Sequence, residues 1–399
     1  MRVEVWSGTA AGEAVSVRRY VGLEARELAL AEERALRRAL RRAPPEERRP
    51  RLATALATAL GNSRETLSGG RVATLLGAFD TLDGERWVVT REDGCGGPSV
   101  ADYVQLAARK GARAPVGFAA TGLADRLDGG RTARRRARYV AQLMRCAAEA
   151  LAELHGAQVA HASLGPSSLM VGPAPLDERS ATPWGVPPRI RLQDLAFSVD
   201  VSDAAMMGGA TPGEVWGGAS GADLYSSPTM VAAGVTPPRE SLAAEAARDL
   251  FGRAAQAGAE TAEQRRNYAF SEDVRALGLS FALLALGGFS APGSMDIPQL
   301  DRMMVAVVGD GSGDSAEALR EYVLADGRFS RAAQALDGRP RDESVEDSGW
   351  GLLAAMCRSD WRARPAAASI LRHPFISGEG ESPLEWLLLP RFDYPELPE

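Results

Sequence analysis

Amine, thiol and imidazole groups, which often perform acid–base, nucleophilic or metal chemistry, are few in this sequence. Lys110 is the one lysine among 46 Lys and Arg residues, so a mechanism that needs a titratable amine has a single candidate. The other candidates are three cysteines and three histidines, namely Cys95, Cys146, Cys357, His155, His161 and His373. The cysteines form no CxxC pair and the histidines are dispersed, which argues against a disulfide framework or a zinc site.

The composition is that of a globular protein with a large core. Hydrophobic residues make up 45 % of the 399 residues, and the net charge of −6 does not favour nucleic acid as a partner. The longest apolar stretch, residues 277–289, is too short for a transmembrane segment, and no signal peptide is visible. We therefore predict an intracellular protein in a reducing compartment, with a plastid kept as a second candidate because a removed transit peptide would leave no trace.

The first part of the chain is predicted to form strands around one helix. The alternation of Val3 and Val5, and then of valines in residues 15–21, is typical of two strands. Residues 24–42 have the composition of a helix, and residues 71–79 and 86–90 predict two further strands.

Beyond the Gly-rich loop at residues 94–98 the sequence is mostly helical. In residues 137–154 and 273–287 the apolar side chains recur every three or four positions, which predicts two buried helices. Strands followed by helices indicate an α+β fold.

Three segments are predicted insertions, and the chain ends in an acidic tail. The insertions are near residues 172–188, 200–222 and 237–268, the last of which is a candidate surface helix. The tail, residues 377–399, encloses an apolar segment around Trp386, which either packs on its own domain or docks a partner. The arginines of residues 131–138 either form a solvated face or bind an acidic group.

Five segments, in the right order, resemble motifs of the protein kinase family. The resemblance covers most of the chain and is carried by residues 154–168 (LHGAQVAHASLGPSS), 191–196 (RLQDLA), 225–229 (YSSPT), 273–278 (DVRALG) and 360–376 (DWRARP through LRHPFI). It implies a two-lobed kinase-like fold, with a small, mainly antiparallel β N-lobe in residues 1–93 and a large helical C-lobe in residues 94–376.

The resemblance implies that residues with structural roles are kept while those that perform the chemistry are replaced. His161 matches the histidine of the catalytic loop, and Asp273 matches the aspartate that caps this loop. Ser163 stands at the position of the catalytic base and Ser168 at that of the metal-binding asparagine. A serine hydroxyl is no base near neutral pH, and it does not match an asparagine amide oxygen as a magnesium ligand. Asp194 is therefore the one candidate magnesium ligand that the resemblance leaves.

The small lobe departs from the kinase pattern as well. The resemblance places Arg18 at the position of the phosphate-contacting lysine, with Glu32 or Glu33 as its partner in the helix. No GxGxxG motif is present and few residues precede Ala11, so the phosphate cradle is expected to be truncated or missing. Arg18 and Thr90 remain as candidate nucleotide contacts.

One further departure affects structure. Thr229 replaces the glutamate that pairs with the arginine at position 364 in the family, so Arg364 is expected to find another acceptor.

Together these observations predict a pseudokinase that acts as a protein-binding scaffold, or as an allosteric or structural subunit of a complex, with little or no phosphoryl transfer. The alternative is a degenerate but active Ser/Thr kinase, or a nucleotide-binding transferase, that uses Asp194 and Arg18. No cofactor is expected under the first hypothesis, whereas the second requires ATP and magnesium. The predicted partners are proteins.

Overall fold

The structure is a computed structural model of the chain. It describes residues 2–10, 13–42, 72–73, 75–81, 85–91, 99–101, 131–172, 189–202, 242–287, 297–309, 315–326, 336–337 and 344–377. Several predictions concern residues outside this set: Lys110, Cys95, the loop at residues 94–98, the segment 225–229, residues 378–399 of the tail, and most of the insertions near 172–188 and 200–222.

The chain divides into two compact units, each assembled from separate segments of the sequence. The first contains Met1–Glu92, Glu153–Ser163 and Asp194–Asp273, and the second contains Asp93–Ala152, Leu164–Gln193 and Val274–Glu399. The predicted lobe boundary between residues 93 and 94 stays a prediction.

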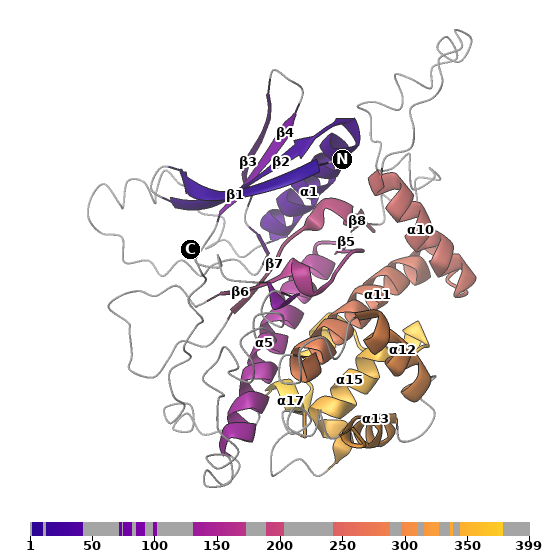
Figure 1. The fold of residues 1–399 in the computed structure, drawn as a ribbon. Helices are drawn as coiled ribbons and strands as arrows, with labels where there is room; N and C mark the ends of the chain where they lie inside the picture. The colour runs from indigo at the N-terminus through magenta and orange to yellow at the C-terminus, as the bar shows by residue number, and fades with distance from the viewer. Residues whose placement is uncertain are drawn as a thin grey trace. The chain divides into compact units, whose positions relative to one another are not determined.

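The first unit is built on a four-stranded antiparallel sheet (Figure 1). Its strands, in the spatial order β1-β2-β4-β3, are β1 (Arg2–Ala10), β2 (Glu13–Val21), β4 (Arg86–Arg91) and β3 (Leu75–Asp80). Strands β1 and β2 pair over nine residues without a register shift, whereas β3 and β4 have an irregularity between Leu75 and Gly77. The two strands predicted at the start of the chain and the two later strands are confirmed.

Helix α1 (Leu23–Arg42) packs against strands β2, β3 and β4. Its buried face follows the helical period and consists largely of small side chains together with Leu28 and Leu36. Two carboxylates, Glu32 and Glu33, lie on this buried face. Buried carboxylates require partners, and the sheet supplies them.

The rest of the first unit consists of helix α10 (Leu242–Gln256), the first half of helix α11 (Ala262–Ala282) and several short segments. Helix α10 lies in the stretch 237–268 for which the sequence predicted a helix. The short segments are the paired strands β5 (Val159–Ala160) and β8 (Val199–Asp200) and the 3-10 turn η2 (Leu195–Phe197).

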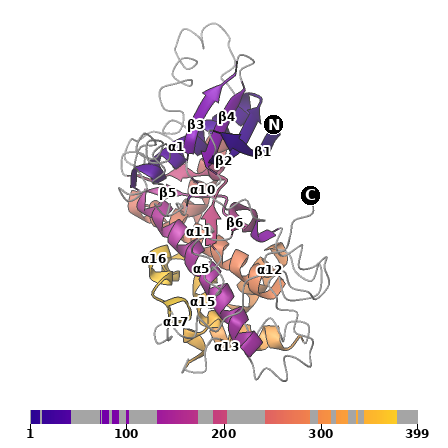
Figure 2. The same ribbon diagram turned by 90° about the vertical axis from the view of Figure 1, so that its left-hand side faces the viewer.

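The second unit is mostly helical, and its helices can be followed in Figure 2. The helices are α5 (Arg131–Gly156, residues 131–152 here), the second half of α11 with a π-helical continuation η3 (Leu283–Gly287), α12 (Ile297–Val307), α13 (Ser315–Leu324), α15 (Gly349–Cys357), α16 (Ala367–Ile370) and α17 (Pro374–Ser377). A two-stranded ladder joins β6 (Leu169–Gly172) to β7 (Arg189–Leu192), and the 3-10 turns are η1 (Pro166–Ser168), η4 (Val345–Asp347) and η5 (Trp361–Ala363).

Helix α15 packs against α12 and α13. Trp350 is fully buried, and its indole N–H donates a hydrogen bond of 3.0 Å to the Asp337 carboxylate. The same carboxylate accepts a bond of 2.8 Å from Arg320. Gly351 approaches the main chain of Glu346 so closely that a Cβ would lie 2.0 Å from the carbonyl oxygen, so only glycine fits there.

The predicted α+β order is confirmed, since an antiparallel sheet comes first and a mostly helical region follows. Among the residues that the structure describes, no helix combines the length and the apolar character needed to cross a membrane.

Candidate functional site

Asp273 organises the loop that follows β5. Its carboxylate accepts hydrogen bonds from the main-chain N–H groups of His161, at 2.7 Å, and Ala162, at 2.9 Å. It also lies 3.0 Å from Nε2 of His155, whose ring stacks on Phe270. Asp273 is 2 % exposed, so these bonds operate in a low-dielectric setting.

The loop held by Asp273 adopts an unusual backbone conformation. Ala162 has a φ of 61°, a left-handed value that is costly for a residue with a Cβ atom. The bonds from Asp273 to this residue and to its neighbour hold the chain in that conformation. Ser163, the next residue, is exposed. The loop therefore presents a hydroxyl, and not a carboxylate, at its exposed position.

Ser168 stands where the kinase resemblance expects the metal-binding asparagine. It belongs to the second unit and is buried. It is the last residue of η1, and its carbonyl accepts a bond of 3.0 Å from the N–H of Gln193.

A buried cluster joins β2 to α1 and η2. The Arg18 guanidinium donates a hydrogen bond to one oxygen of Glu32, and the Tyr20 hydroxyl donates to the other oxygen. Arg18 and Tyr20 alternate with Arg19 on β2 and so lie on the face of the sheet that α1 covers. Both carboxylate oxygens of Glu32 are thus occupied by side chains from the same strand.

Asp194 completes this cluster from the start of η2. Its Oδ1 lies 3.5 Å from Nη1 of Arg18, and its side chain is 49 % exposed. Its φ of 66° is again left-handed, and its side chain makes no capping hydrogen bond to the turn. Asp194 is therefore half open to solvent while its charge is partly balanced by Arg18.

The surroundings of Arg18 and Tyr20 shift the pKa values of both side chains upwards. Burial opposes the charged form of Arg18, but the carboxylates of Glu32 and Asp194 outweigh it and raise the pKa of Arg18. Burial and the neighbouring Glu32 carboxylate raise the pKa of Tyr20. Across the physiological range the cluster therefore contains a cationic arginine and a neutral tyrosine.

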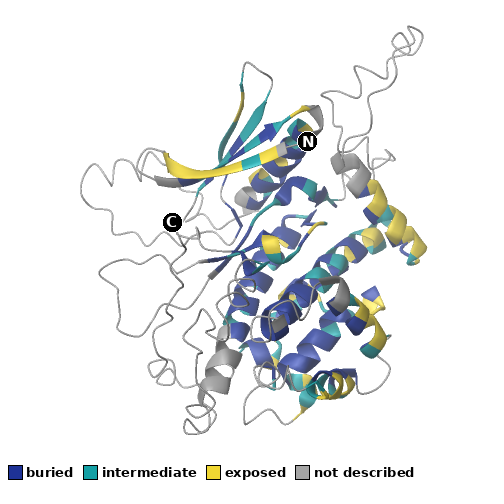
Figure 3. Ribbon diagram, in the orientation of Figure 1, coloured by how far each residue is buried: buried dark blue, intermediate teal, exposed yellow. Residues whose placement is uncertain are grey.

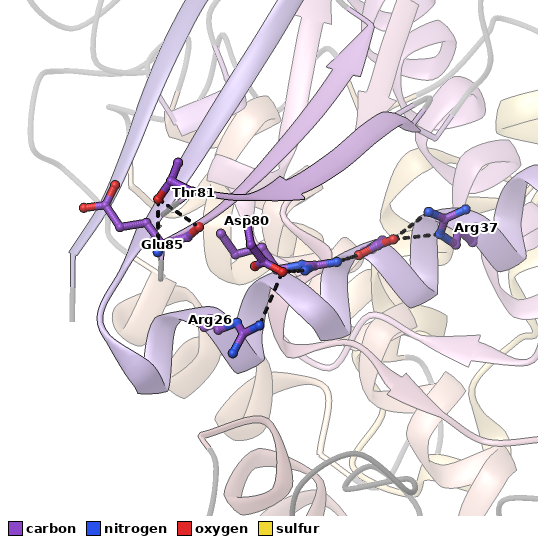
Figure 4. A network of polar contacts seen from close by, with 7 residues as sticks. Arg26, Arg37, Asp80, Thr81 and Glu85 are labelled. Atoms are coloured by element: carbon purple, nitrogen blue, oxygen red, sulfur yellow. Dashed lines mark hydrogen bonds and ion pairs between the residues drawn. The ribbon is translucent and has the colours of Figure 1, made fainter. Parts of the chain in front are cut away.

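The other buried carboxylate of α1, Glu33, belongs to a separate network on the same face of the sheet (Figure 4). Glu33 binds Arg86 of β4 and also Arg37 one turn along the helix. Arg86 in turn donates to Asp80 at 2.9 Å, and Arg26 lies 3.3 Å from the same carboxylate. This network connects α1 to both β3 and β4.

Acid should weaken this network. Burial alone would raise the pKa of Glu33, but the hydrogen bonds from Arg86 and Arg37 outweigh it and lower the pKa. The stabilisation is therefore complete above the ordinary glutamate pKa of about 4.3 and is lost as the pH falls through the lower pKa of the folded state. Urea unfolding at pH 7 and at about pH 3 should show a smaller acid-induced loss of unfolding free energy in Glu33→Gln than in the native chain. Equal losses in the two proteins would contradict this role.

The structure brings together Arg18, Glu32 and Asp194 from the set predicted by sequence. Glu32, and not Glu33, is the partner of Arg18. Thr90 lies buried on β4, with its hydroxyl 3.4 Å from the Ser16 carbonyl on the neighbouring strand.

In the second unit, the acceptors of Arg364 include two main-chain carbonyls. They belong to Arg358, at 2.7 Å, and Ser359, at 3.4 Å.

The sequence patterns did not predict the roles of two residues of the site, Tyr20 and His155. Tyr20 was missed, although its position two residues after Arg18 on a strand places both on one face. No contact between His155 and Asp273 was predicted either. Within the described residues, no group of three or more His, Cys, Asp and Glu side chains is placed to hold a metal ion.

Among known proteins, similarity was found with solved structures. No family model matches the chain, and no curated protein matches it. One similar solved structure is the crystal structure of the Rad53 kinase domain and SCD2 in complex with AMPPNP. It is 13 % identical in sequence, covers 96 % of this chain and 88 % of its own, and has a TM-score of 0.41.

Proposed function

We propose that this chain is a catalytically inactive relative of the protein kinases that acts by binding other proteins, as a scaffold or as a subunit of a complex. The observation that carries the proposal is Ser163. It follows the loop residues that Asp273 holds, where the kinase resemblance puts the catalytic base, and it is exposed. Residues 161–168 (HASLGPSS) contain no carboxylate that could take its place.

The arginine at position 18, where the kinase resemblance expects a lysine, supports the same proposal. Phosphoryl transfer depends on positive charges aimed at the transferred group. The Arg18 guanidinium already binds Glu32 and lies 3.5 Å from Asp194. The charge of Arg18 is therefore shared with two carboxylates of its own chain. An arginine also has a larger planar head than the lysine that it replaces in the resemblance.

One observation favours the alternative of a nucleotide-binding or weakly active enzyme. The Asp194 side chain is 49 % exposed, and its ionic contact with Arg18 is a long one of 3.5 Å. A carboxylate in this state has coordination capacity left for a magnesium ion. The alternative therefore places any residual activity on Asp194, and removing this carboxylate separates the two hypotheses.

A phosphoryl-transfer assay with labelled ATP and magnesium tests the proposal. The native chain and the Asp194→Ala variant should both transfer no phosphoryl group above background, either to themselves or to generic Ser/Thr substrates. Turnover by the native chain that disappears in Asp194→Ala would overturn the proposal and establish the alternative. Ser163→Ala is the matched control, because the serine hydroxyl is expected to contribute nothing in either case.

A further inference from the structure

Strand β1 forms one edge of the sheet. Among the described strands, it has a hydrogen-bonded neighbour, β2, on one side only. It runs for nine residues from Arg2 to Ala10, and its pairing with β2 contains no register shift. Along an antiparallel edge, every second residue directs its N–H and C=O groups away from the paired neighbour. This long, regular edge therefore offers a row of main-chain donors and acceptors.

The two edges of the sheet differ in how well they are protected. Natural edge strands avoid pairing with other chains through shortness, bulges, prolines and lysines. The opposite edge, β3, has six residues, an irregularity between Leu75 and Gly77, and a terminal Asp80 bound by two arginines. Strand β1 has none of these devices, since its sequence RVEVWSGTA contains neither proline nor lysine.

Strand β1 also exposes large apolar side chains on both of its faces. Most of the strand has the yellow colour of exposed residues in Figure 3. Val3 is 40 % exposed and Val5 is 59 % exposed, and both lie on the face that α1 partly covers. Trp6, on the opposite face, is 41 % exposed. Exposed apolar groups beside an unprotected strand edge are typical of an interaction surface.

The opposite face carries a row of aromatic rings that ends at this edge. Phe79 of β3 stacks on Trp87 of β4, with ring centroids 5.9 Å apart. Trp87 in turn stacks on Trp6 of β1, with centroids 5.4 Å apart and planes inclined by 12°. The Arg19 guanidinium lies 5.8 Å from the centroid of Trp87 and is bound by Glu4 and Glu85, so its charge is compensated. The row reaches the edge with its last member half exposed.

We propose that β1 pairs antiparallel with β1 of a second copy of this chain, so that a symmetric dimer shares one continuous sheet. Trp6 is the midpoint of Arg2–Ala10, so the register that pairs the whole strand with itself sets Trp6 opposite Trp6 of the second copy. In this register Val5 lies opposite Ser7, and Glu4 lies opposite Gly8. Each residue thus meets a residue of the same face, and the two Glu4 carboxylates do not oppose one another.

A second copy fits this edge because each feature of the strand is self-complementary in that register. The aromatic rows of the two copies meet at the two-fold axis, and aromatic cross-strand pairs favour such pairing. On the other face, Val3 and Val5 become flanked by Thr9 and Ser7 of the second chain. The inference does not depend on the proposed function, since it concerns the outer edge of the sheet and not the cluster around Arg18.

Sedimentation equilibrium of the purified chain, together with two variants of opposite charge, tests this dimer. The native chain should be a concentration-dependent dimer. Trp6→Glu and Trp6→Arg should each be monomeric at concentrations where the native chain is dimeric, because two like charges meet at the axis. Mixing the two variants should restore a dimer that contains one copy of each.

Control variants distinguish pairing through β1 from association through another surface and from loss of the fold. Phe79→Glu changes the same aromatic row at the opposite edge and should leave the dimer intact. Val5→Lys alters the edge without touching the aromatic row and should also abolish the dimer, and circular dichroism should show that each variant is folded. A native chain that is monomeric at all concentrations, or a dimer that persists in both Trp6 variants, would overturn the proposal.

Discussion

The Asp273→Ala variant should lose about 3–5 kcal/mol of unfolding free energy in the first unit. The native carboxylate accepts bonds from the N–H groups of His161 and Ala162 and also contacts Nε2 of His155. Alanine would leave these buried groups without their acceptor, and it would release the left-handed conformation of Ala162. Urea unfolding followed by circular dichroism, or hydrogen exchange of the two amides, measures the effect.

Two further variants make this test specific. Asp273→Asn retains one oxygen acceptor and should cost clearly less than alanine. Glu263→Ala changes an exposed carboxylate of the same helix and should cost less than about 1 kcal/mol. Equal losses in Asp273→Ala and Glu263→Ala would show that Asp273 does not organise the loop.

The Glu32→Ala variant should have an effect of similar size for a different reason. Glu32 is 2 % exposed and accepts hydrogen bonds from Arg18 and Tyr20. Its removal leaves a buried guanidinium whose remaining carboxylate in the cluster is that of Asp194, at 3.5 Å. Breaking one side of a buried ion pair typically costs about 3–5 kcal/mol. The free energy of unfolding in urea measures the loss.

A double variant separates the loss of the ion pair from the loss of packing. When both charges are replaced by apolar groups of similar volume, no charge remains buried without a partner. Arg18→Met combined with Glu32→Leu should therefore recover much of the stability that Glu32→Ala loses. If the double variant is no more stable than Glu32→Ala, the uncompensated charge is not the cause.

The sequence predicted the elements of the first unit well because their patterns are local. Valine alternation identified the strand pair, and the composition of residues 24–42 identified α1, which spans Leu23–Arg42. Which of Glu32 and Glu33 pairs with Arg18 could not be predicted from the local sequence pattern. Glu32 lies four residues after Leu28 and Glu33 four residues after Ala29, so both fall on the buried face. Only the packing of α1 on the sheet assigns Glu32 to Arg18 and Glu33 to Arg86.

Other features of the site depend on contacts between residues far apart in the chain. The contact between His155 and Asp273 joins residues 118 positions apart, and no spacing rule connects them. The role of Tyr20 could not be predicted from the sequence, because its hydroxyl donates to the carboxylate oxygen of Glu32 that Arg18 leaves open. The edge position of β1 follows from the order of strands in the sheet, which the sequence pattern alone does not determine.

A titration with ATP, with and without magnesium, tests the proposed inactivity most directly, because phosphoryl transfer requires that the folded chain bind the nucleotide. A ligand present at 100 times its dissociation constant would stabilise the folded chain by about 2.7 kcal/mol. We predict no shift in melting temperature and no calorimetric heat at millimolar ATP, with or without magnesium. A magnesium-dependent shift that disappears in Asp194→Ala would contradict this prediction, because Asp194 would then be a working metal ligand.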